Sequence, residues 1–180
     1  MERAFVGFGS NVGPREVALA GALAALARLP GVRLVGTSRV YETQPVGVGV
    51  GGPFLNAAAE ILFRGEPEDL LGRLLGIERE AGRVRRGGRP GPRPLDLDLL
   101  LFGNRCVEAP GLRVPHPRLH ERAFALRPLL DLAPELGHPV LGVPLRDLLE
   151  RARDRCGLRP WPRAVPGFPG RSPERNKKHF

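Results

Sequence analysis

Hydrophobic residues along the chain follow two periods, and these predict the secondary structure. Leucines spaced three and four residues apart indicate amphipathic helices, whereas short apolar runs bounded by glycine or proline indicate strands. Strands are expected at 3–9, 32–41, 54–63 and 95–102. Helices are expected to begin at Pro14 and Pro67, because proline suits the first helical turn. They are expected to end at Pro30-Gly31 and near Gly82.

The order of these elements, βαββαβ, is that of a ferredoxin-like α+β sandwich with a mostly antiparallel sheet. Two shorter helical patterns follow, near 121–132 and 144–153. They would pack on the sheet and complete a three-layer α/β/α arrangement. The 180 residues are enough for one domain with a real core and hardly enough for two. We therefore expect a single domain over 1–153, followed by a basic, proline- and glycine-rich extension over 154–180.

The formal charge of +9 is concentrated near the C-terminus. Residues 151–180 contain nine Lys/Arg and two Asp/Glu, whereas residues 1–150 contain 19 and 17. A duplex-binding domain normally carries its basic surface on the fold itself, so the nearly neutral body argues against nucleic acid as a partner. From Pro160 onward, repeated prolines favour an extended, solvated tail without a core of its own.

The composition favours a cytoplasmic protein without a membrane partner. No apolar window approaches the roughly 20 residues that a membrane helix needs, and the stretch MERAFVGFGSN lacks the apolar core of a secretion signal. Cys106 and Cys156 are not spaced as a metal or redox pair, and lone thiols are typical of a reducing compartment. We expect a monomer or a weak homodimer.

Two carboxylates interrupt the apolar run LDLDLLLFG: Asp96 and Asp98. Because side chains alternate along a strand, both acids should point to one face, with Cα atoms roughly 6.6 Å apart. The opposite face would carry Leu95, Leu97, Leu99 and Leu101 into the core. Neighbouring carboxylates are favoured when a divalent cation lies between them, and Mg²⁺ usually joins one or two acids to substrate phosphates. The alternative is a solvated strand face whose acids pair with arginines.

The loop before this strand supplies the opposite charge. Its backbone is softened by Gly87, Gly88 and Gly91, and five arginines fall within eleven residues: Arg83, Arg85, Arg86, Arg89 and Arg93. The planar guanidinium suits phosphate oxygens because it donates two parallel hydrogen bonds. A solvated basic loop would explain the arginines alone. Acids that bind a metal and arginines that bind phosphate oxygens, however, together make up a polyphosphate site. The acids and the loop arginines together therefore favour a functional site over a solvated surface.

Glu78 adds a further polar position on an apolar surface. It lies on the same face of the second predicted helix as Leu71, Leu74 and Leu75. A carboxylate on that face needs a partner or a ligand. A structural pair with an arginine and a contact with a ligand are both open.

Four blocks, in order, resemble the 6-hydroxymethyl-7,8-dihydropterin pyrophosphokinase family of folate biosynthesis. They are FVGFGSNVG (5–13), SRVYETQPVG with FLNAA (38–47 and 54–58), IEREAGRVR with GPRPLDLDLLLFG (77–85 and 91–103), and VPHPRLHERAFALRPLLDLAPE (114–135). The resemblance implies an ATP-dependent diphosphotransferase that uses two Mg²⁺. It would move pyrophosphate from ATP to the hydroxymethyl oxygen of the dihydropterin and release AMP.

The resemblance also implies site residues. Asp96 and Asp98 would be metal ligands and, with Arg83 and Arg93, the catalytic residues. The implied pterin site consists of Thr43, Pro45, Val46, Phe54, Asn56 and Phe124. Two aromatics can stack on a flat heterocycle, and an asparagine offers its edge both donors and an acceptor. The implied nucleotide site consists of Leu71, Glu78, Arg83, Arg85, Arg93, Leu99, Arg113, His116 and Arg122.

Two other functions remain as alternatives. A Mg-dependent phosphohydrolase would share the acids but would not explain a pocket of aromatics and asparagine. An RNA-binding ferredoxin-like module would need exposed aromatics on its central strands and a basic sheet face. Phe5 and Phe8 of the first strand point to opposite faces, and the body is nearly neutral. AMP as the product, against ADP or free phosphate, distinguishes the three functions.

Overall fold

A single antiparallel sheet organises the chain, whose computed structural model describes residues 1–44, 52–83, 92–152 and 157–169. The strands of this sheet are β1 (Glu2–Ser10), β2 (Val32–Thr37), β3 (Tyr41–Thr43), β4 (Phe54–Phe63), β5 (Asp96–Phe102) and β8 (Arg159–Pro160). Their order is β5-β1-β4-β3-β8, and β2 pairs with β4 beside β3. The strands β6 (Val107–Ala109) and β7 (Leu112–Val114) form a separate hairpin.

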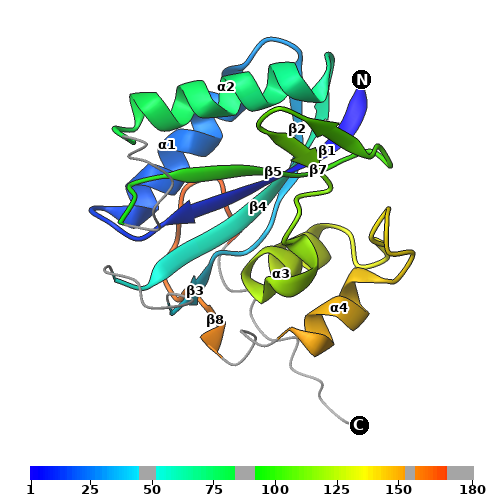
Figure 1. Ribbon diagram of the computed structural model, residues 1–180. Helices are drawn as coiled ribbons and strands as arrows, with labels where there is room; N and C mark the ends of the chain where they lie inside the picture. Colours follow the sequence, from blue (N-terminus) through cyan, green and yellow to red (C-terminus); the bar gives the residue numbers. More distant parts are fainter. Residues whose placement is uncertain (45–51, 84–91, 153–156, 170–180) are drawn as a thin grey trace, which may run out of the picture.

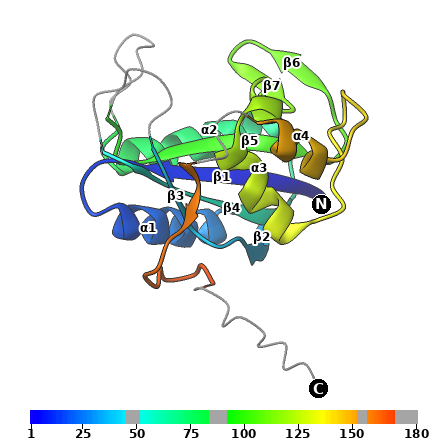
Figure 2. The ribbon, with the colours of Figure 1, turned by 90° about the horizontal axis from the view of Figure 1, so that it is seen from below.

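Helices cover both faces of the sheet, as the sequence predicted. They are α1 (Arg15–Arg28), α2 (Pro67–Glu80), α3 (Ala123–Leu132) and α4 (Leu145–Arg151), with a 3₁₀ turn, η1 (Leu119–Glu121), before α3. Figure 1 and Figure 2 show α1 and α2 on one face and α3 and α4 on the other. The three-layer α+β architecture and the mostly antiparallel sheet are therefore confirmed. Among the described residues, no helix has the length and apolarity to cross a membrane.

Two hydrophobic cores lie on the two faces, because alternate residues of each strand point to opposite sides. On the α1–α2 side, Val6 and Phe8 of β1 pack with leucines of both helices. On the α3–α4 side, Phe5 and Ala58 pack with Leu126 and Leu129 of α3. The sheet thus separates the α1–α2 core from the α3–α4 face, on which Asp96 and Asp98 lie.

A β-bulge in β5 changes one sequence prediction. Phe5 pairs with Leu101 and Val6 with Leu99, so Leu100 is an extra residue between consecutive partners of β1. An extra residue reverses the alternation beyond it. Leu95, Leu97 and Leu99 do enter the α1–α2 core, but Leu101 enters the α3–α4 core together with Leu100. The prediction that Leu101 shares a face with the other three is therefore wrong.

The predicted strand 32–41 is divided into β2 and β3, which both pair with β4. Ser38 lies between them and is buried. Its hydroxyl donates to Arg39 O at 2.7 Å and accepts a hydrogen bond from Ala58 N at 2.8 Å. A side chain that bonds the backbone in place of a neighbouring strand interrupts the ladder locally.

Residues 157–169, which we call the C-terminal strap, return to the body. The strap adds β8 to the free edge of β3 and then passes over the α1–α2 side of the sheet, where Val165 and Phe168 are buried (Figure 2). The expectation of a solvated tail is therefore wrong for these residues. The prolines disfavour a helix, but an edge strand tolerates proline. The apolar side chains Val165 and Phe168 pack into the core on the α1–α2 side of the sheet.

Candidate active site

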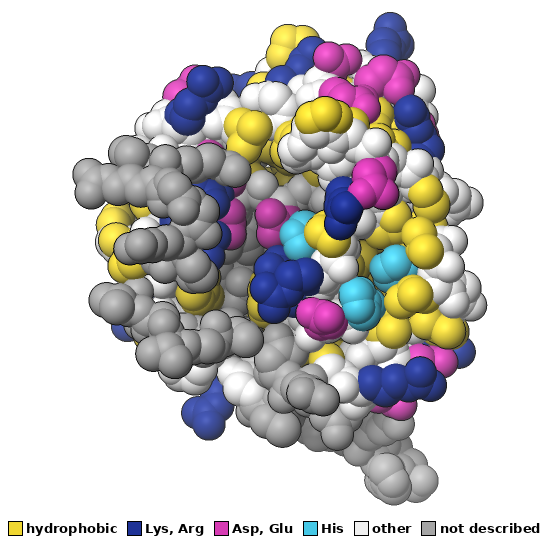
Figure 3. All heavy atoms as spheres, in the orientation of Figure 1, with side chains coloured by type: hydrophobic (Ala, Val, Ile, Leu, Met, Phe, Trp, Pro, Cys, Tyr) yellow, Lys and Arg dark blue, Asp and Glu magenta, His cyan; other side chains and the backbone are white. Residues whose placement is uncertain are grey.

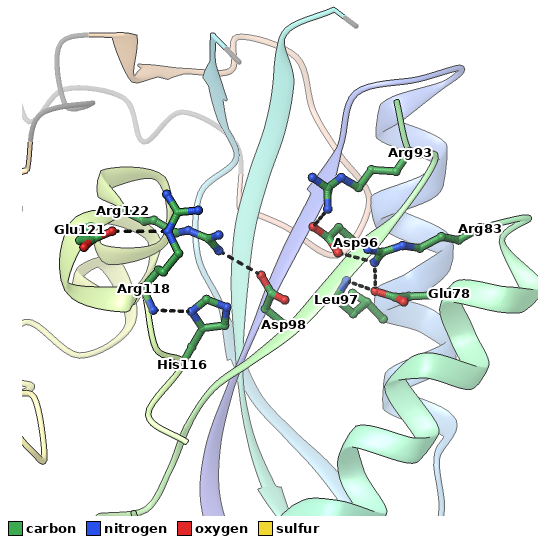
Figure 4. Close-up of polar contacts among 10 residues, drawn as sticks. All are labelled: Glu78, Arg83, Arg93, Asp96, Leu97, Asp98, His116, Arg118, Glu121 and Arg122. Carbon is green, nitrogen blue, oxygen red and sulfur yellow. Dashed lines mark hydrogen bonds and ion pairs between the residues drawn. The ribbon is translucent and has the colours of Figure 1, made fainter. Parts of the chain in front are cut away.

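The two acids of β5 share one face of the sheet; Asp96 lies beside Arg83 and Glu78, near the end of α2, and Asp98 lies on the side of His116 and Arg122 (Figure 4). Because β5 is an edge strand, the N–H groups of its outer side need partners from outside the sheet. Glu78 of α2 provides one, since its Oε1 accepts a hydrogen bond from Leu97 N at 2.7 Å. Glu78 is 1% exposed and also pairs with Arg83. Of the two alternatives for Glu78, a structural pair with an arginine and a contact with a ligand, these contacts show the structural pair.

Asp96 is held between two of the predicted catalytic arginines. Arg83 Nη1 contacts Asp96 Oδ1 as well as Glu78, and Arg93 Nη1 donates to Asp96 Oδ2 at 2.8 Å. The guanidinium of Arg83 thus bridges two carboxylates, one from α2 and one from β5 (Figure 4). The sequence placed arginines and acids near one another, and the structure brings these four side chains into direct contact.

Asp98 lies in a different environment, with Arg122 Nη1 3.7 Å from its Oδ2. Burial raises the pKa of Asp98 to about 6, and the negative charge of Asp96 acts in the same direction. Arg122 and Arg83 oppose this increase. A carboxylate that is desolvated beside another acid favours a cationic ligand.

Arg93 is anchored by its backbone and also carries an orphan donor. Asn11, at the end of β1, accepts a hydrogen bond from Arg93 N at 2.8 Å and donates its own N–H to Arg93 O at 3.2 Å. Arg93 Nε is buried and has no hydrogen-bond partner among the described residues. A buried donor of this kind is usually satisfied, and a phosphate oxygen would satisfy it.

Three of the residues predicted to bind a pterin, Thr43, Phe54 and Asn56, lie on β3 and β4 near Asp96, whereas Phe124 lies on α3. Asn56 Nδ2 donates to Thr43 Oγ1 at 2.8 Å, and both side chains are buried. Gly9 of β1 connects this pair to the acids. A Cβ on Gly9 would lie 3.6 Å from Asp96 Cβ, 3.7 Å from Asn56 Oδ1 and 3.9 Å from Phe54 Cδ1. Gly9 therefore lies between Asp96 and the surface formed by Asn56 and Phe54, and its lack of a side chain leaves the space between them open.

Each of the two predicted stacking aromatics lies against an arginine that reaches an acid. Arg93 Cζ is 5.8 Å from the centroid of Phe54, and Arg122 Cζ is 5.4 Å from that of Phe124. Both phenylalanines are only partly buried, unlike the core aromatics Phe5 and Phe8. Partly exposed rings beside a polar cluster suit a binding surface better than a core.

A cavity of about 730 Å³ opens on the other side of Asp98. Its lining comes from α2, β5, the β6–β7 hairpin and the segment after β7, and it includes Leu71, Asp98, Leu99, Arg113 and His116. Figure 3 shows acidic, basic and histidine side chains gathered around a hollow on this face. The volume falls within the range of small-molecule sites, and four of the residues predicted to bind a nucleotide line it.

His116 is neutral at physiological pH. Burial lowers the pKa of His116 to about 4, and the positive charge of Arg122 adds to the decrease. His116 Nδ1 accepts a hydrogen bond from Arg118 N at 3.2 Å, so the proton of the neutral ring is on Nε2. The ring can therefore donate one hydrogen bond to an anionic ligand without carrying a charge.

Three predicted site residues, Pro45, Val46 and Arg85, lie outside the described residues. Within the described part of the chain, no cluster of three or more His, Cys, Asp or Glu side chains could hold a metal by itself. Asp96 and Asp98 nevertheless fit Mg²⁺, because this ion takes one or two carboxylates and completes its shell with water and phosphate oxygens. The raised pKa of Asp98 supports a cation at this position.

Sequence reasoning missed the residues that hold the site together. Gly9 and Asn11 belong to the block FVGFGSNVG, which contributed to the family resemblance but gave no role to either residue. Asp131 of α3 was also missed. It accepts hydrogen bonds from Arg39 Nη2 at 2.9 Å, Tyr41 Oη at 2.8 Å and Arg127 Nη2 at 3.0 Å, and so ties α3 to β3. Only an invariant pattern across many relatives could have marked such positions in advance.

Known proteins resemble this chain over most of its length. The model of the family "7,8-dihydro-6-hydroxymethylpterin-pyrophosphokinase (HPPK)" matches residues 5–134. A 2-amino-4-hydroxy-6-hydroxymethyldihydropteridine pyrophosphokinase of Pseudomonas aeruginosa is 45% identical over 139 residues, which cover 77% of this chain and 85% of the relative. A Bacillus subtilis protein of the same name is 39% identical over 158 residues, covering 88% and 89%.

Longer proteins match as well. The folic acid synthesis protein fol1 of Schizosaccharomyces pombe is 38% identical over 148 residues, and the match spans 82% of this chain but only 20% of that protein. A crystal structure of wild-type Plasmodium falciparum HPPK-DHPS has a TM-score of 0.68 at 16% identity, covering 83% of this chain and 44% of that one. This likeness shows a shared fold. On the family model and the two bacterial relatives, the chain belongs to the 7,8-dihydro-6-hydroxymethylpterin-pyrophosphokinase family.

Proposed function

We propose that this chain transfers pyrophosphate from ATP to the hydroxymethyl group of 6-hydroxymethyl-7,8-dihydropterin and releases AMP. The observation that carries the proposal is the position of Asp96 and Asp98. They lie between an aromatic-and-asparagine surface on β3 and β4 and a cavity of about 730 Å³ beside Asp98. Two substrates bound on these two sides would meet at the acids.

Asp96 and Asp98 would hold two Mg²⁺ ions, which would neutralise the triphosphate and lower the pKa of the hydroxymethyl oxygen when bound. The protein's own part is to position the reactants and to supply charge, as in other phosphoryl transfers. The two carboxylates would hold the cation at a fixed place on β5. The hydrogen bond that Leu97 N donates to the Glu78 carboxylate holds the strand at the residue between the two acids.

The arginines would bind the phosphates. Arg83 and Arg93 already lie within contact distance of Asp96, so each could bind a phosphate oxygen next to the metal ligands. The orphan Nε of Arg93 supports this role, as does the guanidinium's ability to donate two parallel hydrogen bonds. Arg83 and Arg93 would stabilise the charge that develops on the leaving AMP. Neutral His116 and Arg122 would contact the triphosphate of the same ATP.

Thr43, Asn56, Phe54 and Phe124 would bind the pterin. Phe54 and Phe124 would lie against the faces of the ring, while the Asn56 amide would pair with its polar edge. The absence of a side chain at Gly9 leaves room for the ring to approach Asp96, because a Cβ there would enter the space between Asp96, Asn56 and Phe54.

The alternatives receive less support. Phe5 and Phe8 are 2% and 3% exposed, so neither can stack on a base, and an RNA-binding sheet is not supported. A phosphohydrolase would need only the acids and the arginines. It would leave the Asn56–Thr43 pair and the two partly exposed phenylalanines unexplained.

The test is product analysis. The protein is incubated with ATP, Mg²⁺ and the hydroxymethyl dihydropterin, and nucleotides are separated by chromatography. We expect AMP and pterin diphosphate in equal amounts, with no AMP when the pterin is omitted or when EDTA is added. ADP, or phosphate released without the pterin, would contradict the proposal.

The proposal includes a cytoplasmic location. It is supported by Cys106, a free and exposed thiol that a reducing compartment would preserve.

A further inference from the structure

The C-terminal strap lies outside the 5–134 region that the family model matches, yet it is packed closely against the body. Its residues Arg159 and Pro160 pair with Glu42 and Tyr41 of β3, and Trp161 N donates to Val40 O at 2.9 Å. A strand of three residues such as β3 is short for a sheet edge. The strap gives this edge a second neighbour.

The far end of the strap is anchored on the opposite side of the sheet from the candidate site. Phe168 is buried, with its ring centroid 5.6 Å from that of Phe8 in an edge-to-face contact. Thr37 Oγ1 donates to Gly167 O at 2.7 Å. The strap is therefore held at both ends, by backbone pairing at β8 and by a hydrophobic contact at Phe168.

Between these anchors, Trp161 supports an arginine that spans two strands. Arg15, the first residue of α1, lies over the Trp161 ring with Cζ 5.1 Å from the centroid. Arg15 Nη1 donates to Glu42 Oε1 at 3.0 Å and to Pro53 O at 2.6 Å. Glu42 precedes Thr43 on β3, and Pro53 precedes Phe54 on β4.

Arg15 therefore joins the two segments that carry the proposed pterin residues. Thr43 is paired with Phe54 in the register of β3 and β4, and Asn56 is hydrogen-bonded to Thr43. The residues between these segments, 45–51, lie outside the described part of the chain. The pairing of β3 with β4 brings the two ends together, and the Arg15 guanidinium, which lies against the Trp161 ring of the strap, adds a side-chain link between them.

We infer that the C-terminal strap is a positioning element of the pterin site, in which Trp161 acts through Arg15 to hold Thr43 and Phe54 at their binding distance. This inference rests on the proposed function. Trp161 itself touches neither substrate in this arrangement. A binding site whose side chains are already held in place loses less conformational freedom when the ligand binds. The strap therefore contributes to pterin affinity and not to the chemical step.

The experiment compares three full-length variants with the wild type. Trp161→Ala removes the ring, Trp161→Phe keeps an aromatic face for Arg15, and Arg28→Ala is a control at the exposed other end of the same helix. The rate of AMP formation is measured while the pterin and ATP concentrations are varied separately. Trp161→Ala should raise KM for the pterin about 3- to 10-fold, the range of a cation–π contact, with kcat and KM for ATP within about twofold of wild type.

Trp161→Phe should recover most of the pterin KM, and Arg28→Ala should match the wild type. A fourth variant, Arg15→Gln, should raise KM for the pterin as Trp161→Ala does. Trp161 is the one tryptophan of the sequence, so acrylamide quenching of its fluorescence reports directly whether the strap of Arg15→Gln remains packed.

Two results would overturn the inference. One is an unchanged pterin KM in both Trp161→Ala and Arg15→Gln. The other is an equal rise of both KM values with a fall in kcat, which would indicate a general structural role. Failure of the proposed function is recognised separately, because the wild-type protein would then form no AMP.

Discussion

Asn11 and Arg93 are 82 residues apart in the sequence and are joined by two hydrogen bonds. The Asn11 side chain accepts from Arg93 N at 2.8 Å, and Asn11 N donates to Arg93 O at 3.2 Å. The turn after β1 thus fixes the backbone from which Arg93 reaches Asp96. An arginine that must meet a phosphate in one geometry benefits from such an anchor.

Arg93→Ala should lower kcat far more than it weakens pterin binding. An arginine that stabilises charge in phosphoryl transfer contributes roughly 10³-fold or more to the rate, whereas the pterin contacts other residues. Steady-state rates of AMP formation and a direct pterin titration separate the two effects. Asn11→Ala should cause a smaller loss of kcat, because the guanidinium is retained and only its anchor is removed.

Arg79→Ala serves as the matched control, since Arg79 is exposed on α2 close to Glu78. Weakened pterin binding with an undiminished kcat in Arg93→Ala would refute the role given to Arg93.

Asp98→Asn should lower the rate of Mg-dependent AMP formation by at least about 100-fold, because a neutral amide is a poor Mg²⁺ ligand. The same change should not destabilise the fold. The pKa of Asp98 is raised to about 6, so the folded protein binds more protons than the unfolded chain between the ordinary value and about 6. Wild-type stability therefore falls as pH rises through this window.

The Asp98→Asn variant carries no titrating group at this position, so in EDTA it should gain stability relative to wild type as pH rises from about 4 to about 7. Urea unfolding at several pH values measures this difference. Undiminished turnover of Asp98→Asn would remove the metal assignment.

Phe124→Ala should chiefly weaken pterin binding. Loss of one stacking ring costs about 0.5–1.5 kcal/mol beyond lost contact area, or about 2- to 13-fold in affinity. ATP affinity, measured separately by calorimetry with a non-hydrolysable analogue, should stay near the wild-type value. A larger loss of affinity for the nucleotide than for the pterin would contradict the assignment of Phe124 to the pterin site.

His116 should titrate with a pKa of about 4 in NMR spectra of the protein without nucleotide. The cause is burial together with the charge of Arg122, so Arg122→Ala should move the pKa of His116 upward. Because the folded value lies below the ordinary 6.5, the unfolded chain binds more protons between pH 4 and 6.5, and His116 makes stability fall as pH falls through this window. The resonance is assigned with His116→Gln. A titration near 6.5 would contradict the buried, neutral ring.

Asp131→Ala should destabilise the protein by about 3 kcal/mol, because two guanidiniums and a buried hydroxyl would lose their shared acceptor. Tyr41→Phe should cost about 1 kcal/mol, since it removes one hydroxyl from the same cluster. Urea unfolding measures both. Equal losses from the two changes would indicate that Asp131 is not the centre of the cluster.

The sequence predicted the elements and the shared face of the two acids because both depend on local patterns. Alternation around Asp96 and Asp98 and the leucine spacing of α1 and α2 are visible in short windows. The family resemblance added residues such as Asn56, whose contact with Thr43 joins different strands. The sequence alone does not show whether Glu78 pairs with an arginine, because a helix face does not indicate what packs against it.

The missed features all depend on contacts between distant segments. Trp161 and Phe168 are apolar residues in a proline-rich stretch, and nothing near them in sequence indicates that β3 has a free edge. The extra residue Leu100 is visible only when β5 is aligned with β1. Gly9 differs from other glycines only because Asp96, Asn56 and Phe54 approach it.

The bulge at Leu100 divides β5 into two parts that are out of phase with each other. The acids lie before it, and the connection to the β6–β7 hairpin lies after it. Deleting Leu100 would leave Leu101 opposite Phe5 and Phe102 opposite Ala4, so both side chains would keep their faces, as would the two carboxylates. The face of the acids and the face of the residues that lead to the β6–β7 hairpin therefore do not depend on whether this extra residue is present.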